Sequence, residues 1–150
     1  MNRRLQAALL AFALTCPVAS AAEAGESNDR DAFSVRDVQG PTAFAFDGSV
    51  IVGAVVAPAA AVGRFTADGN GLLTDGVRIL VVGGTALHQT FTCTYTVNPI
   101  GTGSATCIVM TGSVPSDESF DFVIVEKKKQ AYFTATTPGV TIRGATKRQH

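Results

Sequence analysis

Residues 92–107 read TCTYTVNPIGTGSATC and predict a β-hairpin whose turn determines how its two strands pair. Pro99 has the φ angle that the second position of a type I turn requires, and Asn98 is favoured just before it. Gly101 can adopt the positive φ of the left-handed residue that completes a three-residue hairpin loop. We therefore expect Asn98 to face Thr102, which sets the register of the whole hairpin.

This register brings two cysteines face to face. Counting back from the turn, Tyr95 faces Ala105 and Cys93 faces Cys107. If the turn begins with a hydrogen-bonded pair, the cysteines occupy a non-hydrogen-bonded pair, whose Cα atoms lie ~4.5 Å apart and accept a disulfide. We predict that disulfide. A zinc half-site is the alternative, but no second pair of ligands has suitable spacing.

Strand alternation assigns the two faces of the first hairpin strand. Phe91, Cys93 and Tyr95 share the face that we expect to be buried, whereas His88 and the threonines at 90, 92, 94 and 96 share the solvent face. A solvent-facing histidine on an outer strand is the simpler reading of His88, and a catalytic base is the alternative.

Length and composition indicate one all-β domain. The chain has 150 residues, of which 46% are hydrophobic and only 16% charged, and phenylalanine and glycine are frequent. The formal net charge is zero, so no basic field favours nucleic acid as a partner.

The N-terminus has the three parts of a signal peptide. Arg3 and Arg4 precede an apolar run at residues 5–14, and small residues follow, so we expect residues 1–21 to be removed, with a cut after Ala22 as the alternative. The apolar run is too short to span a bilayer. The protein is then exported to the periplasm or beyond, and loss of Cys16 leaves one pair of cysteines for an oxidising compartment. The alternative is a lipoprotein anchored at Cys16.

Two parts of the mature chain follow from polarity and turns. Residues 22–40 are polar and predict a flexible N-terminal segment, with a short ordered piece at residues 33–38. Residues 41–150 predict about eight short strands joined by tight turns, including Asp68-Gly69-Asn70-Gly71 and a basic turn at residues 127–130. We expect Pro58 to end the first strand, a bulge at Asp75-Gly76, and a loop at residues 114–117.

Short connections place sequence neighbours side by side, so we predict an antiparallel up-and-down meander that closes into a β-barrel. Such a barrel is just wide enough to be filled by side chains or to hold one small ligand. Parity assigns nine side chains inward as the expected lining of its interior: Phe44, Phe46, Phe65, Gln89, Phe91, Tyr95, Phe120, Phe122 and Phe133. Gln89 is either at the barrel mouth or a polar handle within a cavity.

Three motifs resemble a family of small exported bacterial proteins of unknown function. They are VGRFTADGNG at residues 62–71, YTVNP with GTG at residues 95–103, and GATKRQ at residues 144–149. The resemblance covers residue 40 to the end and, by architecture, implies a calycin-type or allene-oxide-cyclase-type barrel, which says little about function. The chain departs from lipocalins because it has no tryptophan, and the family's strand residues at the hairpin are not cysteines.

The remaining motifs point to no metal or cofactor. The turn at residues 68–71 fails as a calcium loop, because Leu72 and Ile79 stand where an EF-hand needs oxygen ligands. The lysines at 127–129 form a solubilising turn, with contact to anionic lipid or polysaccharide as the alternative. No nucleophile–base constellation is recognisable, which disfavours an enzyme.

Three functions stay open for the predicted barrel. The first is a binding module for a small apolar ligand held in the interior. The second is a structural or interaction protein whose solid barrel presents loops to a partner, and the third is a cyclase or isomerase that uses the barrel as a shaped pocket. A cavity of ~300 Å³ or more would favour the first over the second. The oligomeric state is left open.

Overall fold

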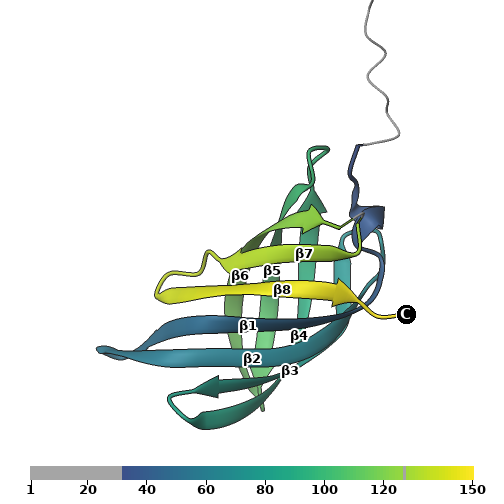
Figure 1. The fold of residues 1–150 in the computed structure, drawn as a ribbon. Coiled ribbons are helices and arrows are strands. Elements are labelled where there is room, and N and C mark those ends of the chain that lie inside the picture. The colour runs from purple at the N-terminus through teal and green to yellow at the C-terminus, as the bar shows by residue number, and fades with distance from the viewer. Residues whose placement is uncertain (1–31, 127) are drawn as a thin grey trace, which may run out of the picture.

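The computed structural model describes residues 32–126 and 128–150, which form the predicted closed β-barrel (Figure 1). The predicted leader with Cys16, residues 22–31 of the N-terminal segment, and Lys127 lie outside the described residues. Each strand pairs antiparallel with the next, and the last pairs with the first. The strands are β1 (Gly40–Val52), β2 (Val55–Ala67), β3 (Leu72–Val82), β4 (Thr85–Val97), β5 (Thr102–Thr111), β6 (Val114–Val125), β7 (Gln130–Ala135) and β8 (Val140–Arg148).

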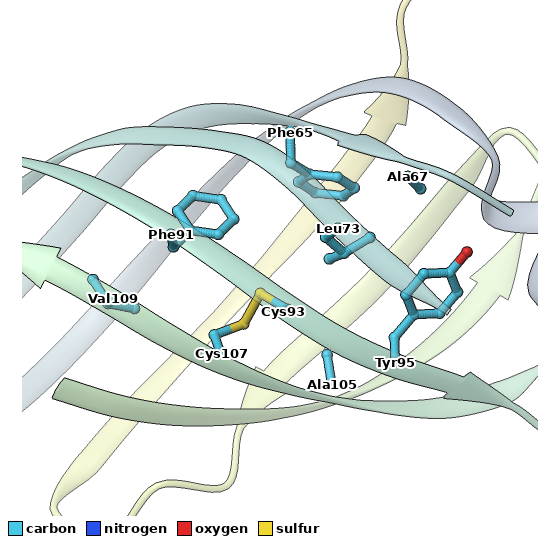
Figure 2. Packing of buried hydrophobic residues seen from close by; sticks show 9 residues of the cluster. All are labelled: Phe65, Ala67, Leu73, Phe91, Cys93, Tyr95, Ala105, Cys107 and Val109. Atoms are coloured by element: carbon cyan, nitrogen blue, oxygen red, sulfur yellow. A yellow bond between two sulfur atoms is a disulfide. The ribbon is translucent and has the colours of Figure 1, made fainter. Parts of the chain in front are cut away.

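The hairpin of β4 and β5 has the predicted register. The amide of Asn98 donates to the carbonyl of Thr102 at 2.7 Å, and Gly101 adopts a φ of +88°. Cys93 therefore lies opposite Cys107 with 4.0 Å between the Cα atoms, and the two sulfur atoms are 2.02 Å apart, at disulfide distance. Both side chains point into the barrel, where they pack beside Tyr95 (Figure 2).

The prediction that Pro58 ends the first strand is wrong. The first hairpin turns at residues 53–54, and Pro58 lies inside β2, opposite Ser49. Its carbonyl accepts a hydrogen bond from the amide of Gly83 at 3.0 Å. Because the N and O atoms of a strand residue point to the same side, the missing N–H of Pro58 faces the β3–β4 turn and removes no ladder bond to β1.

Residues 114–117 form the start of β6, and the prediction of a loop there is wrong. Pro115 lies opposite Met110, and the turn is formed by residues 112–113 instead. β7 pairs with β6 only from Phe120 to Val125, so the first half of β6 has a strand on one side only. Proline is tolerated on such an edge because its missing N–H has no partner to lose.

The turn between β2 and β3 and the bulge that follows it are as predicted. A carboxylate oxygen of Asp68 accepts hydrogen bonds from the amides of Asn70 (2.7 Å) and Leu72 (2.9 Å). These bonds favour the ionised form and hold the pKa of Asp68 below its ordinary value. The β3–β4 register shifts between Leu73 and Gly76, which shows the bulge at the expected place.

Four phenylalanine rings lie across glycines of the neighbouring strand. Phe44 lies opposite Gly63 and Phe133 opposite Gly144, and the pairs Phe91–Gly76 and Phe122–Gly103 repeat the arrangement. A Cβ atom on Gly63 would lie 2.6 Å from Cζ of Phe44, so only glycine leaves room for the ring. Because these rings lie flat over the glycines of the barrel wall, they leave part of the space around the barrel axis unfilled.

One mouth of the barrel is covered by a 3₁₀ helix, η1 (Val35–Val38), which lies within the segment where a short ordered piece was expected. Val35 and Val38 pack against the larger buried cluster, which includes Phe65, Phe91 and Tyr95. The smaller buried cluster, around Phe46, Leu80 and Ile142, fills the opposite half of the barrel.

Candidate functional site

The barrel interior contains a cavity of about 100 Å³ that begins beneath η1 and is partly open to solvent. Its wall is almost entirely apolar, and it extends from Val38 at the covered mouth to Arg78 and Glu118 in the middle of the barrel. Its other lining residues come from all eight strands and are Phe44, Phe46, Phe65, Leu73, Phe91, Cys93, Tyr95, Ala105, Cys107, Val109, Phe120, Phe122, Ala131, Phe133 and Thr146.

Eight of the nine residues assigned inward from the sequence line this cavity, and Gln89 does not. Aromatic contacts centre on Phe44, whose ring lies 5.8 Å from that of Phe91 and 6.1 Å from that of Phe65. Phe120 and Phe122 are only half-buried although they point inward. An inward ring keeps some accessible surface where no other side chain covers it, which is the condition along a cavity.

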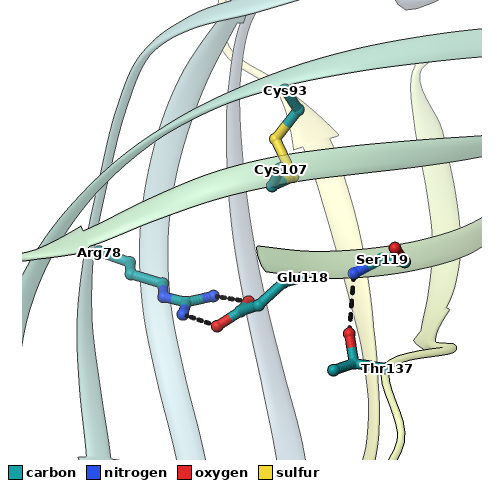
Figure 3. The surroundings of a disulfide bond; sticks show 6 residues. All are labelled: Arg78, Cys93, Cys107, Glu118, Ser119 and Thr137. Carbon is teal, nitrogen blue, oxygen red and sulfur yellow. Dashed lines mark hydrogen bonds and ion pairs between the residues drawn. A yellow bond between two sulfur atoms is a disulfide. The ribbon is translucent and has the colours of Figure 1, made fainter. Parts of the chain in front are cut away.

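An ion pair between the buried Arg78 and the partly exposed Glu118 lies at the end of the cavity away from η1 (Figure 3). The guanidinium of Arg78 donates to both carboxylate oxygens of Glu118, at 2.8 Å and 2.5 Å. Its Nε donates to Gln89 Oε1 at 2.6 Å, and Gln89 Nε2 donates to the hydroxyl of Thr111 at 2.6 Å. The guanidinium carbon also lies 5.8 Å from the ring centre of Phe46.

The two members of this pair differ in burial. The side chain of Arg78 is 4% exposed, whereas that of Glu118 is 22% exposed. Glu118 lies in the half of β6 that has no β7 neighbour, so water can approach its carboxylate from the open side of the strand. Gln89 acts as a bridge behind Arg78 and contributes no surface to the cavity.

Arg78 and Glu118 were not among the residues assigned inward from the sequence, although the alternation of strand residues gives both of them inward parity. Arg78 shares the parity of Leu80 beyond the bulge, and Glu118 shares the parity of Phe120. The expected loop at residues 114–117 stopped the parity count one residue too early for Glu118 to be assigned inward. That the two side chains meet could not be read from the sequence, because 40 residues separate them.

Several polar contacts hold η1 over the cavity. The hydroxyl of Tyr95 donates to the carbonyl of Val35 at 2.9 Å, and the amide of Phe33 donates to the carbonyl of Pro99 at 3.0 Å. Lys128 Nζ lies 2.9 Å from a carboxylate oxygen of Asp37. These contacts tie the N-terminal segment to two turns and one strand of the barrel.

The environment of η1 shifts two pKa values. Burial raises the pKa of Asp37, but the hydrogen bond and charge of Lys128 and the hydrogen bonds from Ser34 outweigh it, so the pKa lies below its ordinary value. Burial of the phenol, with a smaller effect from the negative charge of Asp68, raises the pKa of Tyr95. Tyr95 therefore stays protonated and can donate to η1 at neutral pH.

The other residues considered from the sequence lie away from the cavity. His88 is exposed on the outer face of β4, and Asp68 and Lys128 lie in turns at the end of the barrel that carries η1. Within residues 32–126 and 128–150, no group of three or more His, Cys, Asp or Glu side chains is placed to hold a metal ion. In the same part of the chain, no helix has the length and apolar character needed to cross a membrane.

Comparison with known proteins gives no relative: no family model, no curated protein and no solved structure matches the chain.

Proposed function

We propose that the barrel is a binding module that takes a small apolar molecule into its interior. The observation that carries this proposal is the almost entirely apolar lining of the cavity between the phenylalanine rings; its volume of about 100 Å³ is below that of a drug-sized site and restricts the ligand to a very small molecule. Concave apolar sites with a few polar groups at one end are the usual form of small-molecule sites in proteins. The Arg78–Glu118 pair is the polar end here.

The volume sets the size of the ligand. An apolar cavity of ~150 Å³ is known to stay dry and to bind a molecule the size of benzene. A cavity of about 100 Å³ is smaller than that, so a molecule the size of benzene or a short acyl segment is the upper limit for the interior as it stands. A larger ligand would require rings such as Phe44 to leave the glycines that they cover.

The second candidate is a structural or interaction protein with a filled barrel. The cavity volume favours it, because about 100 Å³ is well below the ~300 Å³ at which drug-sized sites begin. In this case the void would be a packing defect, and the loops would be the functional surface. The two candidates differ in whether the interior binds anything.

The test is binding of benzene and indole to the mature chain, measured by calorimetry and by the rise in unfolding temperature. A ligand that binds only the native state raises stability in proportion to the logarithm of its concentration over Kd. Saturable binding with a matching rise in unfolding temperature supports the binding module. No change at concentrations near the solubility limit of each compound would favour the filled barrel.

Two variants locate the binding. Ala105→Leu adds three carbons to a residue that lines the cavity, whereas Ser104→Leu adds apolar bulk to the exposed neighbour on the outer face of β5. We expect the first variant to lose at least tenfold in affinity and the second to bind as the native chain does. Equal binding by both variants would place the ligand outside the barrel.

A further inference from the structure

Charge is segregated along the barrel axis. The end that carries η1 holds both signs of charge, whereas all four turns of the opposite end are uncharged. Residues 48–63, 79–87, 106–116 and 134–142 surround those four turns and contain no Asp, Glu, Lys or Arg. Figure 1 shows the β1–β2 and β7–β8 hairpins projecting on the side away from η1 and the C-terminus.

The uncharged end also exposes large apolar side chains. Ile51, Val52, Val55 and Val56 flank the β1–β2 turn and are 57–67% exposed, and Val114 beside the β5–β6 turn is 66% exposed. These are β-branched residues in solvent at the tips of hairpins, where polar residues are usual. Monomeric soluble proteins rarely leave such a group of apolar side chains without a partner.

The apolar surface continues from the tips onto the outer wall of β2 and β3. Val62 lies opposite Ile79, and Val81 lies opposite Ala60, with Val62 60% and Ile79 43% exposed. This wall is convex because the barrel is closed. The surface is therefore a set of protruding tips and a rounded flank rather than a groove.

We propose that this uncharged end inserts shallowly into the surface of an electrically neutral lipid bilayer. A fluid acyl layer adapts to protruding tips and to a convex flank, whereas a stable protein interface needs a complementary surface that buries ~1,200–2,000 Å². Binding of this kind scales with the apolar area that enters the boundary between headgroups and acyl chains. Basic residues, which anionic lipid would attract, lie at the other end, where Lys128, Lys129, Lys147 and Arg148 are found.

The experiment is flotation of the mature chain with vesicles of phosphatidylcholine alone. We expect the protein to float with the vesicles and to do so equally at low and high salt, because no charge pairing is involved. The variant Val56→Asp should partition at least tenfold less, which corresponds to about 1.4 kcal/mol. The matched control is Ile100→Asp, which places the same charge at a 79% exposed isoleucine in the β4–β5 turn, at the η1 end, and should float as the native chain does.

A milder pair guards against misfolding of the charged variant. Val55→Thr with Val56→Thr keeps side-chain shape and strand propensity but replaces two methyl groups by hydroxyls, and this variant should also float less. Absence of flotation for the native chain overturns the proposal, as does equal flotation of the Val56 and Ile100 variants. Binding only to anionic vesicles that is lost at high salt would assign membrane contact to the basic end instead. A stable dimer in sedimentation velocity that Val56→Asp dissociates would assign the apolar end to a second copy.

Discussion

Removing one partner of the Arg78–Glu118 pair should destabilise the protein much more than removing both partners together. Glu118→Met leaves a guanidinium with 4% exposure and no counter-charge, and arginine cannot lose its proton to relieve the cost. Orphaning one member of a buried pair typically costs ~3–5 kcal/mol. We expect a cost at the lower end of this range, about 3 kcal/mol, because Arg78 keeps its hydrogen bond to Gln89 and its contact with the ring of Phe46.

The reciprocal variant should cost less. Arg78→Met leaves a carboxylate that is 22% exposed and can take a proton or a water molecule, together with an unpaired Gln89 oxygen. We expect about 2 kcal/mol, mostly from that orphaned acceptor. The double variant Arg78→Met with Glu118→Met removes both charges and fills the space with apolar atoms, so it should be more stable than Glu118→Met alone.

Urea unfolding of the four chains, followed by far-ultraviolet circular dichroism, measures these differences through the midpoint and slope. Glu126→Met makes the same chemical change at an exposed turn residue and should alter stability by less than ~0.5 kcal/mol. If the two single effects simply add, the pair is not coupled. If the double variant is as unstable as Glu118→Met, the unpaired guanidinium is not what destabilises that single variant, and either result refutes the reasoning.

Three further predictions concern the wall, the hairpin and η1. Phe122→Ala should cost about 3 kcal/mol because the half-buried ring faces the cavity, whereas Val123→Ala on the outer face should cost less than 1 kcal/mol; similar urea midpoints would contradict the inward assignment. Reduction of the Cys93–Cys107 bond, whose partners are 14 residues apart, should lower stability by roughly 1–3 kcal/mol without unfolding the barrel, and two free thiols in the denatured, unreduced protein would contradict the disulfide itself. Because the pKa of Asp37 is lowered in the folded state, its ionised carboxylate stabilises the docked η1 fully above the unfolded pKa near 3.8. This stabilisation disappears as the pH falls through the lower folded pKa. A protease should therefore cut the native chain on the N-terminal side of η1 faster as the pH falls. The Asp37→Asn variant should be cut fast at every pH. A native cleavage rate that does not change with pH would contradict the role of Asp37 in holding η1.

The sequence by itself determined the local parts of the fold. The turn at residues 98–101 set the hairpin register, because φ preferences of proline and glycine act within four residues. Period-two alternation assigned the eight phenylalanine and tyrosine side chains that line the cavity, because successive strand residues point to opposite faces wherever the strand lies. The local signals failed at Pro58 and Pro115, because a proline is acceptable in a strand only where no neighbouring carbonyl needs its N–H, and which groups lie beside a strand is decided by the tertiary structure.

Only the tertiary structure decided what the barrel interior contains. Parity puts rings inward, but whether they fill the interior depends on the strand opposite, where glycines let Phe44 and Phe133 lie against the wall and leave a cavity. The meeting of Arg78 with Glu118 depends on how β3 and β6 are brought together by closure of the sheet. The segregation of charge follows in the same way, since the uncharged stretches are scattered in the sequence and gather at one end only because an up-and-down barrel places alternate turns at the same mouth.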